Sequence, residues 1–146
     1  MGQNLLAIEP GIGAGPIILG KHRDAIQASY SYVYTSFFKV QTSKFRSDHC
    51  DLAGFTAHYD EYGNTKYIEI YNSEHQAIEY EIFAMPARKL TLSKLKNYLI
   101  SSGISFETED YGIQAPTIGL STFNSQLQSG DEIIECFGIF KSRQSV

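Results

Sequence analysis

Two segments of the chain show the same order of patterns, a short helical period followed by a pair of alternating strands. Residues 18–71 begin with a faint 3.6-residue period of apolar positions and close on an alternating stretch at residues 67–71. Residues 90–140 begin with a stronger helical period and close on a similar stretch at residues 133–137. The repetition predicts an internal duplication of one helix-plus-sheet unit.

The alternation of apolar and polar residues is clearest between residues 55 and 71. It runs over residues 55–59 and again over residues 65–71, as the two faces of a β-strand require. Gly63 and Asn64, which tolerate positive φ, stand between the two stretches and predict a β-hairpin. In the second strand, Tyr67, Glu69 and Tyr71 are expected on one face, with Lys66, Ile68 and Ile70 on the other.

Several weaker patterns complete the predicted elements. A short buried strand is expected at residues 16–19, a strand over residues 77–85 that Pro86 ends, and further strands within residues 104–107, 113–123 and 131–140. The polar segment 42–51 is predicted to be a loop.

The helical period is strongest after residue 90. Thr91 is the expected N-cap and Gly103 the residue that ends the helix. Its apolar stripe is formed by Leu92, Leu95, Leu99 and Ile100. A shorter helix is expected within residues 22–30. We therefore expect residues 1–146 to form a single α+β domain with a mainly antiparallel sheet and two helices.

Composition supports a sheet-rich domain and adds a charge asymmetry. The chain has 146 residues, 42% of them hydrophobic, with 10 Tyr, 9 Phe and no Trp, and such aromatic rings suit half-buried sheet surfaces. The formal net charge is −4, but residues 48–140 hold 14 acidic against five basic side chains. Such a field repels phosphates, so nucleic-acid binding is disfavoured, and it attracts basic proteins.

The sequence indicates a cytoplasmic protein without a cofactor. No apolar run approaches the ~20 residues of a membrane helix, and the N-terminus lacks the basic and apolar regions of a signal peptide. The two cysteines, far apart, indicate reduced thiols. The glycine-rich stretch at residues 8–20 matches neither phosphate-binding spacing, so it is expected to shape turns.

Catalytic and metal-binding motifs are not evident. The four histidines lack the short spacings of metal sites. His49, Cys50 and Asp51 form the one cluster that could support nucleophilic chemistry, but adjacent residues of an extended segment point apart. We therefore expect a binding protein rather than an enzyme, and an enzyme that uses His58 or the His49–Cys50 pair is a third alternative.

Tyrosines beside carboxylates are typical of a protein-binding surface, because tyrosine offers contact area at low entropic cost and carboxylates pair with Arg or Lys. Core packing is expected to use about half of the rings. The residues expected to bind a partner are Asp60, Glu61, Tyr62, Glu79, Glu81, Glu109, Asp110 and Tyr111.

Two stretches of the chain carry a resemblance to a known class of proteins. They are Gly-Ile-Gly-Ala-Gly-Pro-Ile-Ile-Leu-Gly-Lys-His-Arg-Asp-Ala-Ile at residues 11–26, and the later pattern of Gly54-Phe55, Ala57, Tyr59-Asp60, Gly63 and Tyr67-Ile68-Glu69. This pattern resembles small bacterial immunity proteins of polymorphic toxin and contact-dependent growth inhibition systems. The resemblance covers residues 8–71 and, more loosely, extends to Phe140. Its motifs are structural and imply no residue roles. The predicted duplication is also similar to the tandem helix-plus-sheet repeat of β-lactamase inhibitor proteins.

The resemblance implies an immunity protein that binds and neutralises a cognate bacterial toxin. Occlusion of the toxin's active site by the acidic, tyrosine-bearing surface is the expected mechanism. A nuclease is the expected toxin, because its substrate groove must be positive and an acidic blocker gains association rate from that field. The alternative is a small-molecule or peptide-binding module that uses the concave face of the sheet.

Overall fold

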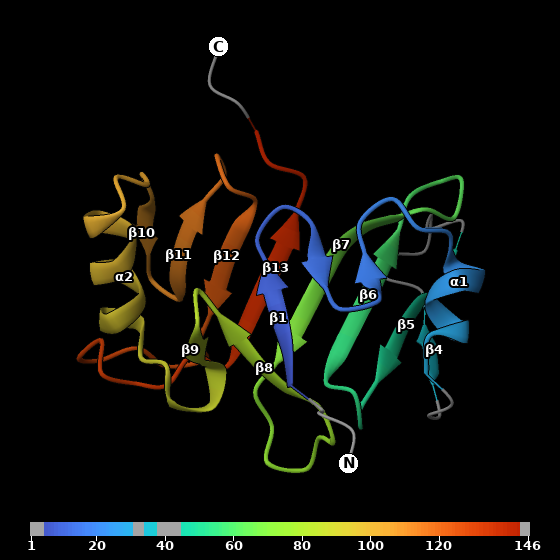
Figure 1. Cartoon of the computed structure of the whole chain (residues 1–146), viewed down its shortest axis with the longest axis horizontal. Helices are drawn as coiled ribbons and strands as arrows, with labels where there is room; N and C mark the ends of the chain where they lie inside the picture. Colours follow the sequence, from blue (N-terminus) through green and yellow to red (C-terminus); the bar gives the residue numbers. More distant parts are fainter. Residues whose placement is uncertain (1–4, 31–33, 38–44, 144–146) are drawn as a thin grey trace.

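Two β-sheets and two α-helices make up the computed structural model, which describes residues 5–30, 34–37 and 45–143 (Figure 1). The larger sheet has eight strands in the order β10-β11-β12-β13-β7-β6-β5-β4, and every neighbouring pair is antiparallel. Its strands are β4 (Thr35–Phe37), β5 (Ser47–Cys50), β6 (Phe55–Tyr59), β7 (Thr65–Tyr71), β10 (Glu107–Glu109), β11 (Gly112–Ala115), β12 (Leu120–Phe123) and β13 (Cys136–Phe140).

The predicted order of elements does occur twice. Helix α1 (Arg23–Ala28) precedes the meander β4 to β7, and helix α2 (Leu92–Ser101) precedes the meander β10 to β13. The last strands of the two meanders, β7 and β13, pair antiparallel and join them into one sheet. The helices consequently lie at opposite ends of that sheet (Figure 1). The prediction of an α+β fold with a mainly antiparallel sheet and two helices is confirmed.

A smaller sheet, which the sequence analysis did not predict, lies against the larger one (Figure 1). Its order is β3-β2-β1-β8-β9, with β1 and β8 parallel. The strands are β1 (Leu5–Glu9), β2 (Gly13–Ala14), β3 (Ile17–Ile18), β8 (Glu79–Ile82) and β9 (Met85–Pro86). The glycine-rich stretch forms the tight turns of this sheet, and the buried strand expected at residues 16–19 is β3, in which Ile17 is fully buried.

Two predicted boundaries are wrong for identifiable reasons. The strand expected over residues 77–85 divides into β8 and β9, because Phe83 and Ala84 adopt positive φ and turn the chain back. Pro86 is the last residue of β9, an edge strand, where its missing N–H costs no ladder bond. The loop expected at residues 42–51 contains β5, whose alternation was hidden because a polar residue, Asp48, is fully buried.

The core lies between the two sheets and the helices. One cluster of buried side chains joins Ile8 and Ile82 of the smaller sheet, Ile26 of α1 and Leu95 of α2 to the inner face of the larger sheet. In β7, Ile68 and Ile70 point into this cluster while the alternate residues do not, as the hairpin pattern predicted. The larger sheet therefore has one face in the core.

Helix α2 matches its prediction except at one residue. The side chain of Thr91 accepts a hydrogen bond from the Lys94 N–H at 3.2 Å, and Gly103 has a φ of +71°. The first three leucines of the expected stripe are buried, but Ile100 is 66% exposed because it lies one step around the helix from the buried face. None of the described helices is long and apolar enough to cross a membrane.

Candidate functional site on the open face of the larger sheet

The face of the larger sheet opposite the core carries a set of polar and aromatic side chains. The register of the strands places Tyr67, Glu69 and Tyr71 of β7 on this face. We call it the open face, because the smaller sheet and the buried sides of both helices lie on the other side, and no described element lies over it (Figure 1). Its central residues are Phe37, Ser47, His49, Thr56, His58, Tyr67, Glu69, Tyr71, Gln114, Ser121, Phe123, Cys136, Gly138 and Phe140.

His58 connects three strands at the middle of the open face. Its Nε2 lies 2.6 Å from the carboxylate of Glu69, and its Nδ1 lies 2.6 Å from the hydroxyl of Ser47. The carboxylate accepts from Nε2, so in the neutral ring Nδ1 accepts from the serine. A serine, a histidine and a carboxylate linked in this order resemble a catalytic triad. However, Ser47 is only 2% exposed and lines none of the hollows of this face that are described below. The chain of bonds positions Glu69 rather than presenting a nucleophile.

A second chain of hydrogen bonds fixes Tyr71. The hydroxyl of Thr56 lies 2.7 Å from Nδ1 of His49 and 3.0 Å from the hydroxyl of Tyr71. Burial is the main cause that raises the pKa of Tyr71 to about 12, so the phenol stays neutral at physiological pH. The ring is therefore a fixed, uncharged contact surface.

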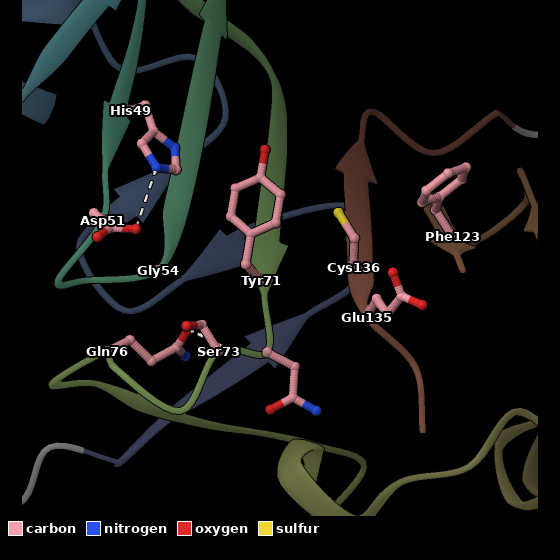
Figure 2. Close-up of a pocket in the computed structure, with 10 residues that line it drawn as sticks. His49, Asp51, Gly54, Tyr71, Ser73, Gln76, Phe123, Glu135 and Cys136 are labelled. Atoms are coloured by element: carbon pink, nitrogen blue, oxygen red, sulfur yellow. Dashed lines mark hydrogen bonds and ion pairs between the residues drawn. The ribbon is translucent and has the colours of Figure 1, made fainter. Parts of the chain in front are cut away.

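Three hollows lie on this face, and two of them adjoin. The third, of about 270 Å³, is lined by Tyr67, Gln114, Ser121, Phe140 and Arg143. The Tyr71 hollow, of about 420 Å³, is lined by His49, Asp51, Gly54, Tyr71, Asn72, Ser73, Gln76, Phe123, Glu135 and Cys136 (Figure 2). The Tyr67 hollow, of about 290 Å³, is lined by Tyr67, Glu69, Glu109, Tyr111, Gly112, Gln114, Ser121, Thr122, Phe123, Cys136 and Gly138. They share Phe123 and Cys136, and the 48% exposed Phe123 ring stands at their common border.

The two adjoining hollows are acidic and partly shaped by a glycine. Each lining holds two carboxylates and no Lys or Arg. At Gly138 a Cβ atom would come within 2.3 Å of both the Tyr67 hydroxyl and the Ser121 hydroxyl. The absence of a side chain there lets these two groups meet above β13. The result is a recessed, aromatic and negatively charged surface.

The eight residues expected to bind a partner fall in three separate places. Asp60, Glu61 and Tyr62 lie in the turn before β7, while Glu109, Asp110 and Tyr111 surround the turn before β11. Because β11 runs antiparallel to β7, the turn before β11 and the turn before β7 lie at opposite ends of the strands. Glu79 and Glu81 belong to β8 in the smaller sheet. Of the eight, Glu109 and Tyr111 are the two that line a hollow of the open face.

The other chemical candidates separate as well. His49 lies on the open face, whereas Cys50 points into the core and is fully buried, so the two do not form a dyad. Burial raises the pKa of the Cys50 thiol, which opposes formation of a thiolate. Within the described part of the chain, no three His, Cys, Asp or Glu residues are grouped so as to hold a metal ion.

Several open-face residues were not among the expected site residues. Tyr67, Glu69 and Tyr71 could have been selected, since the alternation that buries Ile68 and Ile70 predicts them on the opposite face. Asp51, Phe123 and Glu135 had no comparable signal, because only the pairing of β13 with β7 and β12 brings them to the same place. As expected, core packing uses some of the tyrosine rings, since Tyr59 and Tyr80 are only 7% and 2% exposed.

Comparisons of the chain with protein-family models, with curated proteins and with solved structures found no match. The resemblance to immunity proteins therefore stays a prediction.

Proposed function

We propose that this protein is an immunity protein that binds a basic bacterial toxin through the open face and covers the toxin's active site. The proposal depends on one observation above all: the outward side of the larger sheet, over which no described helix or strand lies, carries exposed aromatic rings and carboxylates around Phe123. Sheet faces of this kind normally pack against another layer or stay strongly polar.

The side chains of the open face are suited to binding a protein. Tyr111 and Phe123 are 56% and 48% exposed, and their rings lie 5.8 Å apart. Tyr67 stacks on Phe140 at 6.3 Å between ring centroids. Exposed aromatic residues held on strands or in a tight turn between them bury large areas on association and lose little side-chain entropy.

The charge of the two adjoining hollows favours a basic partner. The two hollows contain the carboxylates of Asp51 and Glu135 and those of Glu69 and Glu109, with no Lys or Arg in either lining. A positive substrate groove, such as that of a nuclease, would meet this surface with complementary potential and a raised association rate. Binding should therefore weaken as the salt concentration rises.

The first experiment is co-purification with the product of the adjacent upstream open reading frame, followed by calorimetry at low and physiological salt. We expect nanomolar affinity that falls with salt. Phe123→Ala should weaken binding about 30-fold, the equivalent of ~2 kcal/mol for a central aromatic contact. Tyr62→Ala is the matched control, because Tyr62 is 70% exposed but lies in the turn before β7.

The two variants separate the competing surfaces. Loss of affinity in Tyr62→Ala with full affinity in Phe123→Ala would move the binding surface from the open face to the turn. If the upstream product does not bind at all, that pairing is refuted, and the alternative module becomes the better interpretation. The Tyr71 hollow favours that alternative in one respect, since about 420 Å³ lies within the usual ~300–1,000 Å³ of small-molecule sites.

A further inference from the structure

We propose that the Tyr71 hollow receives an arginine side chain of the protein partner, attracted by the carboxylates of Asp51 and Glu135 in its lining. This inference rests on the proposed function and specifies which chemical group of the partner is recognised.

The walls of the hollow suit the stem and the flat head of arginine. Tyr71 and Phe123 contribute rings, and Cys136, which is 7% exposed, lies between their strands (Figure 2). Arginine places its methylene groups along apolar surface and its guanidinium over aromatic faces. The phenol of Tyr71 is held by Thr56 at 3.0 Å, so its ring is already positioned before binding.

Two carboxylates flank this aromatic floor. Asp51 follows β5 and Glu135 precedes β13, and Figure 2 shows them on either side of Tyr71. The Glu135 carboxylate accepts hydrogen bonds from the N–H and the hydroxyl of Ser125 at 3.3 and 3.2 Å, which orients it. Asp51 has an 83% exposed side chain and lies 3.7 Å from the His49 ring.

The remaining polar groups of the rim are occupied within the protein. The Gln76 side chain accepts from the Ser73 N–H at 3.0 Å and donates to the Ile78 carbonyl at 2.9 Å. Asn72 donates to the carbonyls of Ala87 and Ile134. The two carboxylates are thus the charged acceptors of the hollow, and its lining supplies no Lys or Arg to neutralise them. A guanidinium can donate two parallel N–H bonds to one of these carboxylates while its plane lies against an aromatic ring, which a lysine ammonium cannot do.

The proposal can be tested without knowing the partner. Acetyl-arginine amide is titrated into the isotopically labelled protein and followed by amide NMR signals, with acetyl-citrulline amide as the neutral analogue of the same shape. We expect arginine to shift the signals of residues 51–54, 71–73 and 135–136 with millimolar affinity, and citrulline to bind about tenfold or more weakly. Acetyl-lysine amide, with a free side-chain amine, should fall between them.

The matched variants change the same net charge at different places. Asp51→Asn with Glu135→Gln should abolish the arginine-induced shifts, whereas Glu61→Gln with Glu81→Gln should leave them unchanged, since those residues lie in the turn before β7 and in β8. Thermal unfolding of both double variants checks that each is folded. Equal binding of arginine and citrulline, or undiminished arginine binding in the first double variant, would overturn the proposal.

The same variants separate this inference from the proposed function. If the toxin binds the Asp51→Asn/Glu135→Gln variant as tightly as the wild type but loses affinity for Phe123→Ala, the open face is the binding surface and the arginine site is refuted. If neither change affects a bound toxin, the open face itself is refuted as the interface.

Discussion

Asp48 is expected to stabilise the fold more than any exposed carboxylate of this chain. The residue is fully buried at the edge of the core, and four side chains donate to its carboxylate. One oxygen accepts from Arg23 Nε at 3.1 Å, Gln27 at 3.1 Å and the Tyr59 hydroxyl at 2.7 Å. The other accepts from the Ser36 hydroxyl at 2.6 Å and Arg23 Nη2 at 3.3 Å. Because Arg23 and Gln27 belong to α1, these bonds fasten the helix to β5.

Replacing this carboxylate by an amide, Asp48→Asn, retains the shape but removes the charge. The introduced amide nitrogen is best placed at the position of the oxygen that Ser36 contacts, because the serine hydroxyl can rotate and accept from it. At that position the amide N–H groups face the N–H groups of Arg23 Nη2, so the bond to Nη2 is lost. Of the three bonds to the remaining oxygen, those from Gln27 and Tyr59 become neutral and the one from Arg23 Nε loses its ion-pair attraction. At about 1 kcal/mol each, the unfolding free energy should fall by ~3 kcal/mol. In urea unfolding followed by circular dichroism, the midpoint should drop by about 1–2 M.

The matched control is Asp51→Asn, three residues along the same segment. It removes the same charge from a side chain that is 83% exposed, and should change unfolding free energy by no more than ~0.5 kcal/mol. If Asp48→Asn were as mild as this control, the buried network would contribute nothing net and the reasoning would be refuted.

The Asp48 network also predicts a dependence on pH. Burial alone would raise the Asp48 pKa, but the hydrogen bonds from Arg23, Ser36 and Tyr59 outweigh it and hold the pKa below its ordinary value. The unfolded chain therefore binds this proton at a higher pH than the folded chain. The stabilisation is complete above the unfolded pKa of about 3.9 and is lost as pH falls through the folded pKa. The stability difference between wild type and Asp48→Asn should accordingly shrink below about pH 4, and a constant difference would contradict the assignment.

Two further predictions concern local structure. Ala84 has a φ of +63° at the β8–β9 turn, so Ala84→Gly should stabilise the protein by about 0.5–1 kcal/mol. The control Ala25→Gly, inside α1, should destabilise it by a similar amount, and two changes of the same sign in urea unfolding would contradict this. The N–H groups of residues 128–130 donate to Glu132, lowering its pKa to about 2, so Glu132→Gln should speed amide exchange of these three residues while Asp131→Asn should not. Because folding lowers that pKa, the contribution of Glu132 should weaken as pH falls below about 4 and should match that of the substitution only near pH 2.

How far the fold was predictable depended on how local its signals are. The β6–β7 hairpin and helix α2 were predictable because their turn, cap and periodicity lie within one short stretch. The smaller sheet was not, since β1 gains its partner β8 only from residues more than 70 positions away. Strand β5 was missed because its inward positions include Asp48, whose burial depends on Arg23 from a distant helix. The same limit applied to the candidate site, where β13 brings Glu135 beside residues of β7.

The two faces of the larger sheet divide stability from recognition along the same strands. In β5, Asp48 and Cys50 face the core while Ser47 and His49 face outward, and in β7 Ile68 and Ile70 alternate with Tyr67, Glu69 and Tyr71. His58 and Thr56 link the outward side chains through hydrogen bonds, so the open face is already ordered in the unbound protein. A surface fixed in advance loses less conformational entropy on association, which favours the slow dissociation that the proposed inhibition of a toxin requires. Loosening these outward bonds, rather than the core, should therefore shorten the lifetime of the complex while leaving global unfolding almost unchanged.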